Sequence, residues 1–445
     1  MKTLIKLLIP VMCFALLSGC TDFDQDNSFV EKETCTNTNS AITRILDFAN
    51  MEAEHFFPSA SRSDMRVANP SDLKFITSNL SRSEEQDTLI YVVNFADNRG
   101  FALISAKDRQ NPLLAIVPEG SYDPEIGTDN PGFNMFIADA KLDAARIGKL
   151  DPIWGDDPST PYIENGKYVR YRKSTLEEIK TEPRLGTDFR WNQFGIKGAE
   201  NIYGRFCPNN SAGCAPVAMG SVIAFYNAMN SKTTNINYTF EERQRDAETI
   251  NWTDIFSHKA AMEIYHDKTL HWDDCSCSPS NHNTIAHFLR QLGQDAKTTY
   301  KPDSTSSTLV SRLTPTLKKY LDDCTVSGLQ YFKDTDLKTA LKEGVAILSG
   351  KRNDDSHAWV IDGLSYKRIL EERYESDITL STNPSNPTYD WKLISSEIKE
   401  TFLCYTHWGW GGDFDGWFSN TYYEPEKTPG DVGTPYTVTR CVTIK

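Results

Sequence analysis

The stretch Ser211-Ala212-Gly213-Cys214-Ala215-Pro216-Val217-Ala218-Met219 decides how the C-terminal half of this chain is expected to fold. Pro216 suits the first turn of a helix, because the N–H that proline lacks would be unpaired there anyway. Gly213 permits a tight entry into that turn. One face of the expected helix carries residues that allow close packing, namely Val217, Ser221, Ala224 and Ala228. The pattern predicts a tightly packed helix that begins at Cys214.

A cysteine at the start of a helix has distinctive chemistry. The helix dipole favours the thiolate there, which is the nucleophilic form, and a nearby imidazolium would favour it further. Cys214 is therefore a candidate nucleophile. The alternative is a structural cysteine in a core helix, which is the common case for a lone cysteine. A histidine far downstream favours the catalytic interpretation.

The motif His357-Ala358-Trp359-Val360-Ile361-Asp362-Gly363 supplies that histidine. An apolar run at 345–348 and a polar turn at 350–355 precede it, which predicts a hairpin with His357 at the start of its second strand. A base held by its own backbone suits general acid–base catalysis. The upstream histidines are expected to be structural or exposed and predict no metal site: His55, His258, His266, His271, His282 and His287.

A third strand is predicted at 401–406, and it leads into His407-Trp408-Gly409-Trp410-Gly411-Gly412. Tryptophans beside a Cys–His pair could shield it from water, and the glycines let backbone approach a substrate closely. The alternative is a pair of core tryptophans followed by a glycine turn.

The N-terminal third predicts a compact α+β unit. Helical periodicity occurs at 41–57 and 133–149, and strand-like runs occur at 89–95, 101–105 and 113–117. Asp97-Asn98-Arg99-Gly100 is typical of a hairpin turn between the first two strands. Residues 150–188 are rich in Pro, Asp and Lys without a clear apolar period, so a connector is expected there.

The composition is that of a globular protein, with 39% hydrophobic and 24% charged residues. A net charge of −14 argues against a nucleic-acid partner. Among the ten cysteines, the pair Cys275 and Cys277 is too closely spaced for the usual zinc site, so a loop or a disulfide to another cysteine remains open there. No cofactor is implied.

The first residues indicate export. Positive charge at Lys2 and Lys6 precedes a short apolar run, as in a signal peptide, and no other segment approaches the roughly 20 apolar residues of a membrane span. Leu17-Ser18-Gly19-Cys20 resembles the bacterial lipoprotein processing box. That resemblance implies cleavage before Cys20 and lipids on Cys20, whereas the alternative is an ordinary signal with a chance cysteine. The polar residues 20–40 are expected to form a disordered tether.

Taken together, the motifs resemble the streptopain-like cysteine peptidases. The matching segments are Trp191-Asn192-Gln193, Gly213-Cys214, the motif that begins at His357, and Trp408-Gly409-Trp410-Gly411-Gly412. The N-terminal block is similar to the family's propeptide. The resemblance implies an α+β fold: a papain-like two-lobed peptidase domain, with one helical and one antiparallel β lobe, preceded by a small α+β propeptide domain.

The expected organisation along the chain follows from this resemblance. It comprises a lipoprotein signal at 1–19, the tether at 20–40, an inhibitory propeptide domain at 41–150, a linker with the processing site at 151–188, and the peptidase domain at 189–445. Processing is expected within about 178–188, and Lys180 and Arg184 are the candidate positions.

The resemblance also implies roles for individual residues. Cys214 and His357 are the catalytic pair, Gln193 joins the Cys214 backbone N–H in the oxyanion hole, and Trp408 and Trp410 flank the histidine. The family usually has Asn where His407 stands. An Asn carbonyl could accept a bond from the ring of His357, and His407 could do so only through a neutral ring nitrogen, which affects how the base is oriented.

The expected function is that of a lipid-anchored cysteine endopeptidase of the bacterial cell envelope, at the outer membrane or cell surface, made as a zymogen. Its partners would be protein or peptide substrates, its own propeptide as inhibitor, and the membrane through the lipids. The alternatives are a surface lipoprotein that uses an inactive peptidase fold as a binding module, and a related transferase.

Overall fold

The computed structural model describes residues 33–59, 61, 65–78, 87–107, 112–147, 162–164, 167–186, 191–193, 203–236, 239–240, 243–244, 248–256, 279–302, 305–331, 333–352, 355–377, 390–420 and 440–445. The chain divides into two compact units, Met1–Ser40 and Ala41–Lys445. The predicted export signal, Cys20, most of the tether and the Cys275–Cys277 segment lie outside the described residues.

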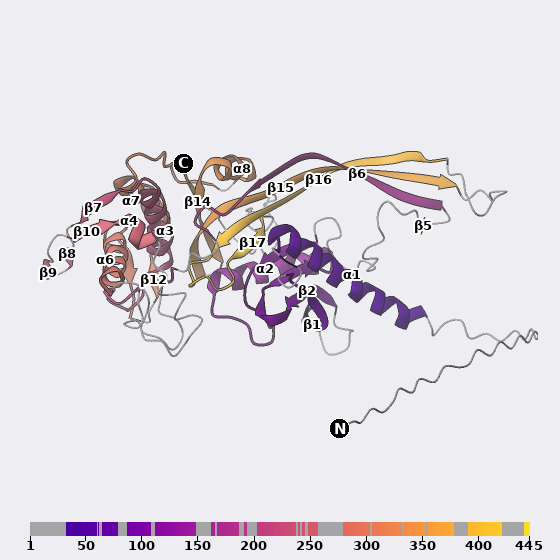
Figure 1. Ribbon diagram of the computed structural model, residues 1–445, viewed down its shortest axis with the longest axis horizontal. Helices are drawn as coiled ribbons and strands as arrows, with labels where there is room; N and C mark the ends of the chain where they lie inside the picture. The colour runs from indigo at the N-terminus through magenta and orange to yellow at the C-terminus, as the bar shows by residue number, and fades with distance from the viewer. Residues whose placement is uncertain are drawn as a thin grey trace, which may run out of the picture. The chain divides into compact units, whose positions relative to one another are not determined.

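The second unit is built around one large sheet (Figure 1). Among the described residues, twelve strands belong to it, in the path β1-β2-β3-β4-β17-β16-β15-β14-β18-β13, with β6 on β15 and β5 on β6. The N-terminal strands join the C-terminal ones through an antiparallel contact between β4 (Leu113–Val117) and β17 (Gly416–Ser419), in which Ile116 pairs with Trp417 and Ala115 with Phe418. Two parts of the chain that are far apart in sequence thus share one backbone hydrogen-bond network.

The N-terminal region, residues 41–147, is α+β as predicted. Its remaining elements are α1 (Glu33–Phe56), β1 (Ala68–Thr77), β2 (Thr88–Phe95), the 3₁₀ turn η2 (Ala96–Asn98), β3 (Phe101–Ser105) and α2 (Pro131–Ile147). The predicted hairpin between β2 and β3 is confirmed. The helix expected from residue 41 begins at Glu33, within the segment expected to be a tether. Strand β1 was not predicted.

Apolar faces of α1 and α2 pack this region onto the shared sheet. Ile45, Ala49 and Ala53 of α1 are buried with Tyr405 and Trp417 of the C-terminal strands. Helix α2 contributes to a second core that also crosses between the two halves. Its aromatic contacts include Phe133 and Phe136 against Phe418, with ring centroids 6.1 and 4.9 Å apart.

The helical lobe surrounds α3 (Cys214–Met229), which begins at the predicted residue. Most residues of this helix are buried, because α4 (Trp252–Phe256), α6 (Pro279–Asp295) and α7 (Leu313–Tyr320) pack around it. The smaller elements of the lobe are β7 (Thr233–Ile236), β8 (Thr239–Phe240), β9 (Arg243–Gln244), β10 (Glu248–Asn251), β11 (Thr299–Tyr300), β12 (Ser306–Ser307) and η4 (Val310–Arg312).

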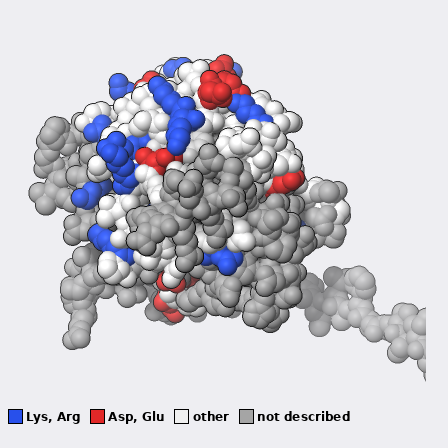
Figure 2. Space-filling view, turned by 90° about the vertical axis from the view of Figure 1, so that its left-hand side faces the viewer, with Lys and Arg blue, Asp and Glu red and all other residues white. Residues whose placement is uncertain are grey.

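The face of the molecule over this lobe carries basic and acidic side chains side by side (Figure 2). Ion pairs of the lobe include Lys232 with Asp322 at 2.7 Å and with Asp323 at 2.8 Å. Such exposed pairs contribute little to stability.

The β lobe contains the predicted hairpin of β14 (Val345–Arg352) and β15 (Asp355–Asp377), in which His357 pairs with Gly350. The predicted strand at 401–406 is the end of β16 (Lys392–His407). The lobe is completed by β13 (Gln330–Tyr331), α8 (Asp334–Glu343) and β18 (Arg440–Ile444). The expected α+β class, with a helical and an antiparallel β lobe after a small α+β domain, is confirmed.

The expected connector at 150–188 is corrected by the structure. It contains β5 (Tyr162–Glu164) and the long strand β6 (Lys167–Thr181), which pairs with β15 from Thr181↔Leu364 to Lys167↔Asp377. The sequence signal was weak because most side chains of β6 are at least partly exposed, so charged residues replace the apolar alternation of a half-buried strand.

Among the residues that the structure describes, no helix has the length and apolar character needed to cross a bilayer. Five cysteines whose side chains are described are free thiols: Cys207, Cys214, Cys324, Cys404 and Cys441.

Candidate active site

Cys214 is the first residue of α3, and the chain can turn into this helix without backbone strain because the preceding residue is a glycine. Gly213 has φ 87°, a conformation that side chains other than glycine's rarely adopt, and a Cβ there would collide with Ser306 Oγ. The Gly213 carbonyl accepts the N–H of Val217 at 3.2 Å, which closes the first turn. The helix N-terminus therefore points its free N–H groups toward the sulfur.

The thiol of Cys214 also meets the strand that carries the predicted base. Burial raises the pKa of Cys214, while hydrogen bonds from the backbone N–H groups of Ala358, Ala215 and Cys214 itself lower it. Ala358 is the residue after His357, so the sulfur lies against the β15 backbone beside the histidine. The structure thus brings together two positions that are far apart in the sequence.

His357 is held by the backbone of the third motif. Its Nε2 lies 2.8 Å from the carbonyl oxygen of Trp408, and since a carbonyl can only accept, Nε2 carries the proton. Nδ1 is then the basic nitrogen when the ring is neutral. The side chain is only 2% exposed and lies nearly parallel to the ring of Trp359. Burial lowers the pKa of His357 to about 4, although the bond to Trp408 opposes the change.

Gln193 lies next to the loop that enters α3. Its backbone carbonyl accepts the N–H of Ala212 at 2.8 Å, two residues before Cys214, and its side chain is buried. The neighbouring Asn192 forms an isolated β-bridge with Trp410. This short segment therefore connects the cysteine loop with the tryptophan loop and places Gln193 close to the start of α3.

The residues of the third motif are divided between two roles. Trp408 is fully buried, supplies the carbonyl bonded to His357, and donates its Nε1–H to the carbonyl of Phe414 at 3.1 Å. Its ring centroid lies 5.6 Å from that of Trp359. Trp410 remains partly exposed beside Asn192.

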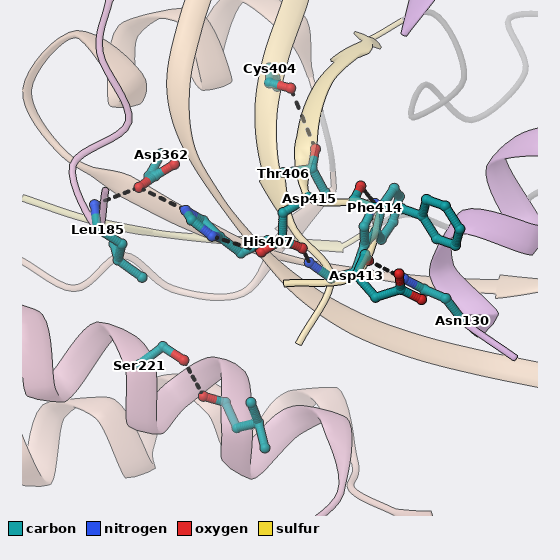
Figure 3. Close-up of polar contacts among 12 residues, drawn as sticks. Asn130, Leu185, Ser221, Asp362, Cys404, Thr406, His407, Asp413, Phe414 and Asp415 are labelled. Atoms are coloured by element: carbon teal, nitrogen blue, oxygen red, sulfur yellow. Dashed lines mark hydrogen bonds and ion pairs between the residues drawn. The ribbon is translucent and has the colours of Figure 1, made fainter. Parts of the chain in front are cut away.

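His407 is not the acceptor for the ring of His357 in this structure. Its two ring nitrogens face carboxylates instead of His357: Nε2 lies 3.2 Å from Asp362 Oδ2, and Nδ1 lies 3.2 Å from Asp415 Oδ2 (Figure 3). The acceptor at His357 Nε2 is the Trp408 carbonyl instead. Sequence reasoning missed this acceptor because a backbone carbonyl has no sequence signature, and it missed Asp362 and Asp415 because each lies in a motif that was read for other residues.

Part of the N-terminal region covers this site. A Cβ at Gly132, in the first turn of α2, would overlap the ring of Trp408 and lie 2.9 Å from Cδ2 of His357. The buried Asn130 donates to the Asp413 carbonyl at 2.8 Å, and the ring of Phe133 stacks on Phe414 at 4.5 Å. Helix α2 therefore closes the histidine side of the site.

Residues 188–418 match the family described as Peptidase C10 family, and residues 38–144 match the one described as Spi protease inhibitor. A thiol protease/hemagglutinin, PrtT of Porphyromonas gingivalis, is 22% identical over 377 residues; the match covers 79% of this chain and 36% of the relative, so the chain spans about a third of that relative's length.

Two solved structures from Prevotella intermedia are also similar. Prointerpain A has a TM-score of 0.43 at 16% identity, covering 83% of this chain and 98% of that one. Active interpain A has a TM-score of 0.31 at 15% identity, covering 59% of this chain and 98% of that one. Because the first family match spans more than half of the 445 residues, the chain belongs to the peptidase C10 family, the streptopain-like cysteine peptidases.

Proposed function

We propose that this chain is a cysteine endopeptidase made as a zymogen, with Cys214 as nucleophile and His357 as general base. His357 Nδ1 takes the thiol proton, which gives a thiolate beside an imidazolium, and the thiolate attacks a peptide carbonyl. The Cys214 backbone N–H and the Gln193 side chain stabilise the oxyanion of the tetrahedral intermediate. The imidazolium then protonates the leaving amine, and water hydrolyses the acyl-enzyme.

The observation that carries the proposal is the bond from His357 Nε2 to the Trp408 carbonyl. It fixes the tautomer in which Nδ1 can accept a proton, and the next residue along the strand, Ala358, has its N–H at the sulfur of Cys214. A structural histidine has no need of this arrangement beside a thiol at a helix N-terminus.

In the uncut chain, Cys214 and His357 have the charge states expected of an inactive precursor. Burial raises the pKa of Cys214 and lowers that of His357 to about 4, so both side chains are neutral near pH 7. A working pair needs the opposite charges, a thiolate beside an imidazolium. Removing the N-terminal region would readmit water to the site and let the pair ionise.

The test is hydrolysis of azocasein by the processed protein. We expect activity in the wild type and its loss in Cys214→Ala, whereas Cys324→Ala, which removes another partly buried free thiol, should retain it. Labelling by an epoxide thiol inhibitor should require Cys214. Robust hydrolysis by Cys214→Ala would refute the assignment, and an unlabelled, inactive wild type would favour a binding module.

For activation, we propose a cut between Glu182 and Gly186. Lys180 lies within the paired strand β6, and its Nζ donates to the His55 carbonyl at 3.1 Å, so its backbone is a poor substrate. Arg184 follows the strand, with its guanidinium bonded to the carbonyls of Gly344 and Lys342. Mass spectrometry of the processed enzyme locates the cut, and a mature form that still contains β6 would contradict it.

We also propose that the protein is anchored by lipids on Cys20 in the bacterial cell envelope, at the outer membrane or cell surface. The support is the sequence Leu17-Ser18-Gly19-Cys20 after an apolar run. Intact-mass analysis after expression in a bacterial host should show loss of residues 1–19 and acyl chains on the new N-terminus, and Cys20→Ala should lack the acyl mass. An unmodified Cys20 in the wild type would refute the anchor.

A further inference from the structure

A buried ionic cluster lies behind the catalytic pair. His407 is 3% exposed, Asp362 is 0% exposed and Asp415 is 4% exposed, and each carboxylate has an oxygen 3.2 Å from a ring nitrogen of the histidine (Figure 3). We name these three residues the Asp–His–Asp cluster. Burying charged groups is costly unless they are paired, so the arrangement requires an explanation.

The geometry determines the protonation state. A neutral imidazole has one N–H and could donate to only one of the two carboxylates, whereas the imidazolium has a donor for each. Burial alone lowers the pKa of His407, but the carboxylates of Asp362 and Asp415 outweigh it and raise the pKa to about 10. The ring centroid of Tyr405 lies 5.1 Å from that of His407. Ser221 of α3 lines the same small cavity as His407, and its hydroxyl donates to the Val217 carbonyl. The two carboxylates therefore favour the imidazolium form of His407 near neutral pH.

The cluster is connected to the catalytic base through Trp408. The Trp408 N–H donates to Asp415 Oδ1 at 2.9 Å, and the carbonyl of the same residue accepts Nε2–H of His357 at 2.8 Å. Asp362 lies on β15 with His357 and also accepts the Leu185 N–H at 2.7 Å. The cluster thus ties β15, the end of β16 and the loop before β17 around the residue that orients the base.

We propose that His407, held between Asp362 and Asp415, is a positioning residue that fixes the Trp408 carbonyl and through it the tautomer and orientation of His357. This inference rests on the proposed catalytic role of His357. A loose carbonyl would let the imidazole turn away from the sulfur. It would also stabilise the imidazolium less, since that charge is favoured by a fixed acceptor at Nε2.

The test uses processed His407→Gln, which retains polar groups but cannot be charged. We expect kcat for a peptide substrate to fall about 10- to 100-fold with KM nearly unchanged, as for a misoriented catalytic group. The pH range over which kcat/KM is high should narrow. Its alkaline limb reports deprotonation of the imidazolium and should move to lower pH by about half a unit to one unit. The pH dependence of the rate at which iodoacetamide alkylates Cys214 should narrow in the same way.

A matched control separates positioning from stability. His287→Gln removes another buried histidine, on α6, whose ring stacks on Phe206 with centroids 3.9 Å apart. It should lower the melting temperature and leave both pH limbs unchanged. If His407→Gln does not fold, Asp415→Asn carries the test, because it keeps an acceptor for the Trp408 N–H while removing one carboxylate from His407.

The outcomes are distinct. A folded His407→Gln with wild-type kcat and wild-type pH limbs overturns the positioning role. A wild type that does not cleave peptides overturns the proposed function instead, and the alkylation profiles of wild type and variant then still decide whether His407 controls the thiol–imidazole pair.

Discussion

At the scale of single residues, Gly132 brings the backbone of α2 against Trp408 and His357. An Ala there would place a methyl group against the Trp408 ring and 2.9 Å from His357 Cδ2. Overpacking of this kind costs about 1–3 kcal/mol. The position therefore tests whether α2 holds the site closed.

We expect Gly132→Ala to open the uncut protein. A loss of about 1.4 kcal/mol in packing corresponds to roughly tenfold more open molecules, and hence to roughly tenfold faster labelling of Cys214 by a thiol-directed inhibitor. The control is Gly328→Ala, where a Cβ has nothing within 4 Å. Equal labelling rates in the two variants and the wild type would mean that α2 does not restrict access.

Glu52 of α1 makes the stability of the folded precursor depend on pH. Burial raises the pKa of this carboxyl from its ordinary 4.5 to about 7, and Lys367 only partly opposes the change. The folded state then binds more protons than the unfolded state between pH 4.5 and 7. Stability from this group is present below pH 4.5 and is lost as the pH rises through 7.

Glu52→Gln should remove that loss. We expect the variant to be more stable than the wild type at pH 8, with the difference shrinking as the pH falls toward 4.5, as measured by urea unfolding of Cys214→Ala precursors. A constant difference between pH 5 and pH 8 would contradict the assigned pKa.

At the scale of elements, the pairing of β6 with β15 should keep the N-terminal fragment bound after the chain is cut. It pairs with β15 along its whole length, and ion pairs flank the ladder, including Lys167 with Glu375 at 3.0 Å and Lys173 with Glu371 at 3.4 Å. Main-chain hydrogen bonds do not depend on a covalent link downstream of the strand.

A cut after β6 should therefore leave the N-terminal fragment bound. We expect the two pieces to elute together in gel filtration of nicked Cys214→Ala protein, and the amides of Lys167–Thr181 to stay protected from hydrogen exchange. High salt should weaken only the ion pairs, which are surface contacts. Immediate separation at low salt would show that β6 contributes little to retention.

The elements also show what the sequence could predict. Helix α3, strands β2 to β4 and the β14–β15 hairpin were found because buried apolar residues make their periodicity clear. Strand β6 and the outer half of β16 were missed because most of their side chains are exposed and pairing, more than burial, holds them. Short apolar patterns report contact with a core, and these segments lack one.

The candidate site was also only partly predictable from the sequence. Cys214 and His357 were predicted from side-chain types and motif order, and Gln193 was predicted from the family resemblance. The Trp408 carbonyl and the contact at Gly132 could not be, because a main-chain oxygen and a missing side chain become meaningful only in three dimensions. His407 was noticed as unusual, but its two carboxylate partners depend on how β15, β16 and the following loop meet.

At the scale of the whole molecule, the N-terminal region and the β lobe share a core. Phe101 and Phe133 are buried in one cluster with Trp359, Trp408 and Phe418. The precursor therefore hides a large apolar surface, and the two halves should not be viewed as independently packed bodies. The same contacts that close the active site also contribute to folding.

The junction of β4 with β17 has a consequence for the enzyme after activation. In the precursor, β17 has a neighbour on each side, β16 and β4. Departure of β4 would leave a row of unsatisfied main-chain groups at the margin of the sheet, bordered by Trp417 and Phe418. Such margins recruit strands from other molecules and promote aggregation. An intact precursor would thus stay soluble as well as inactive.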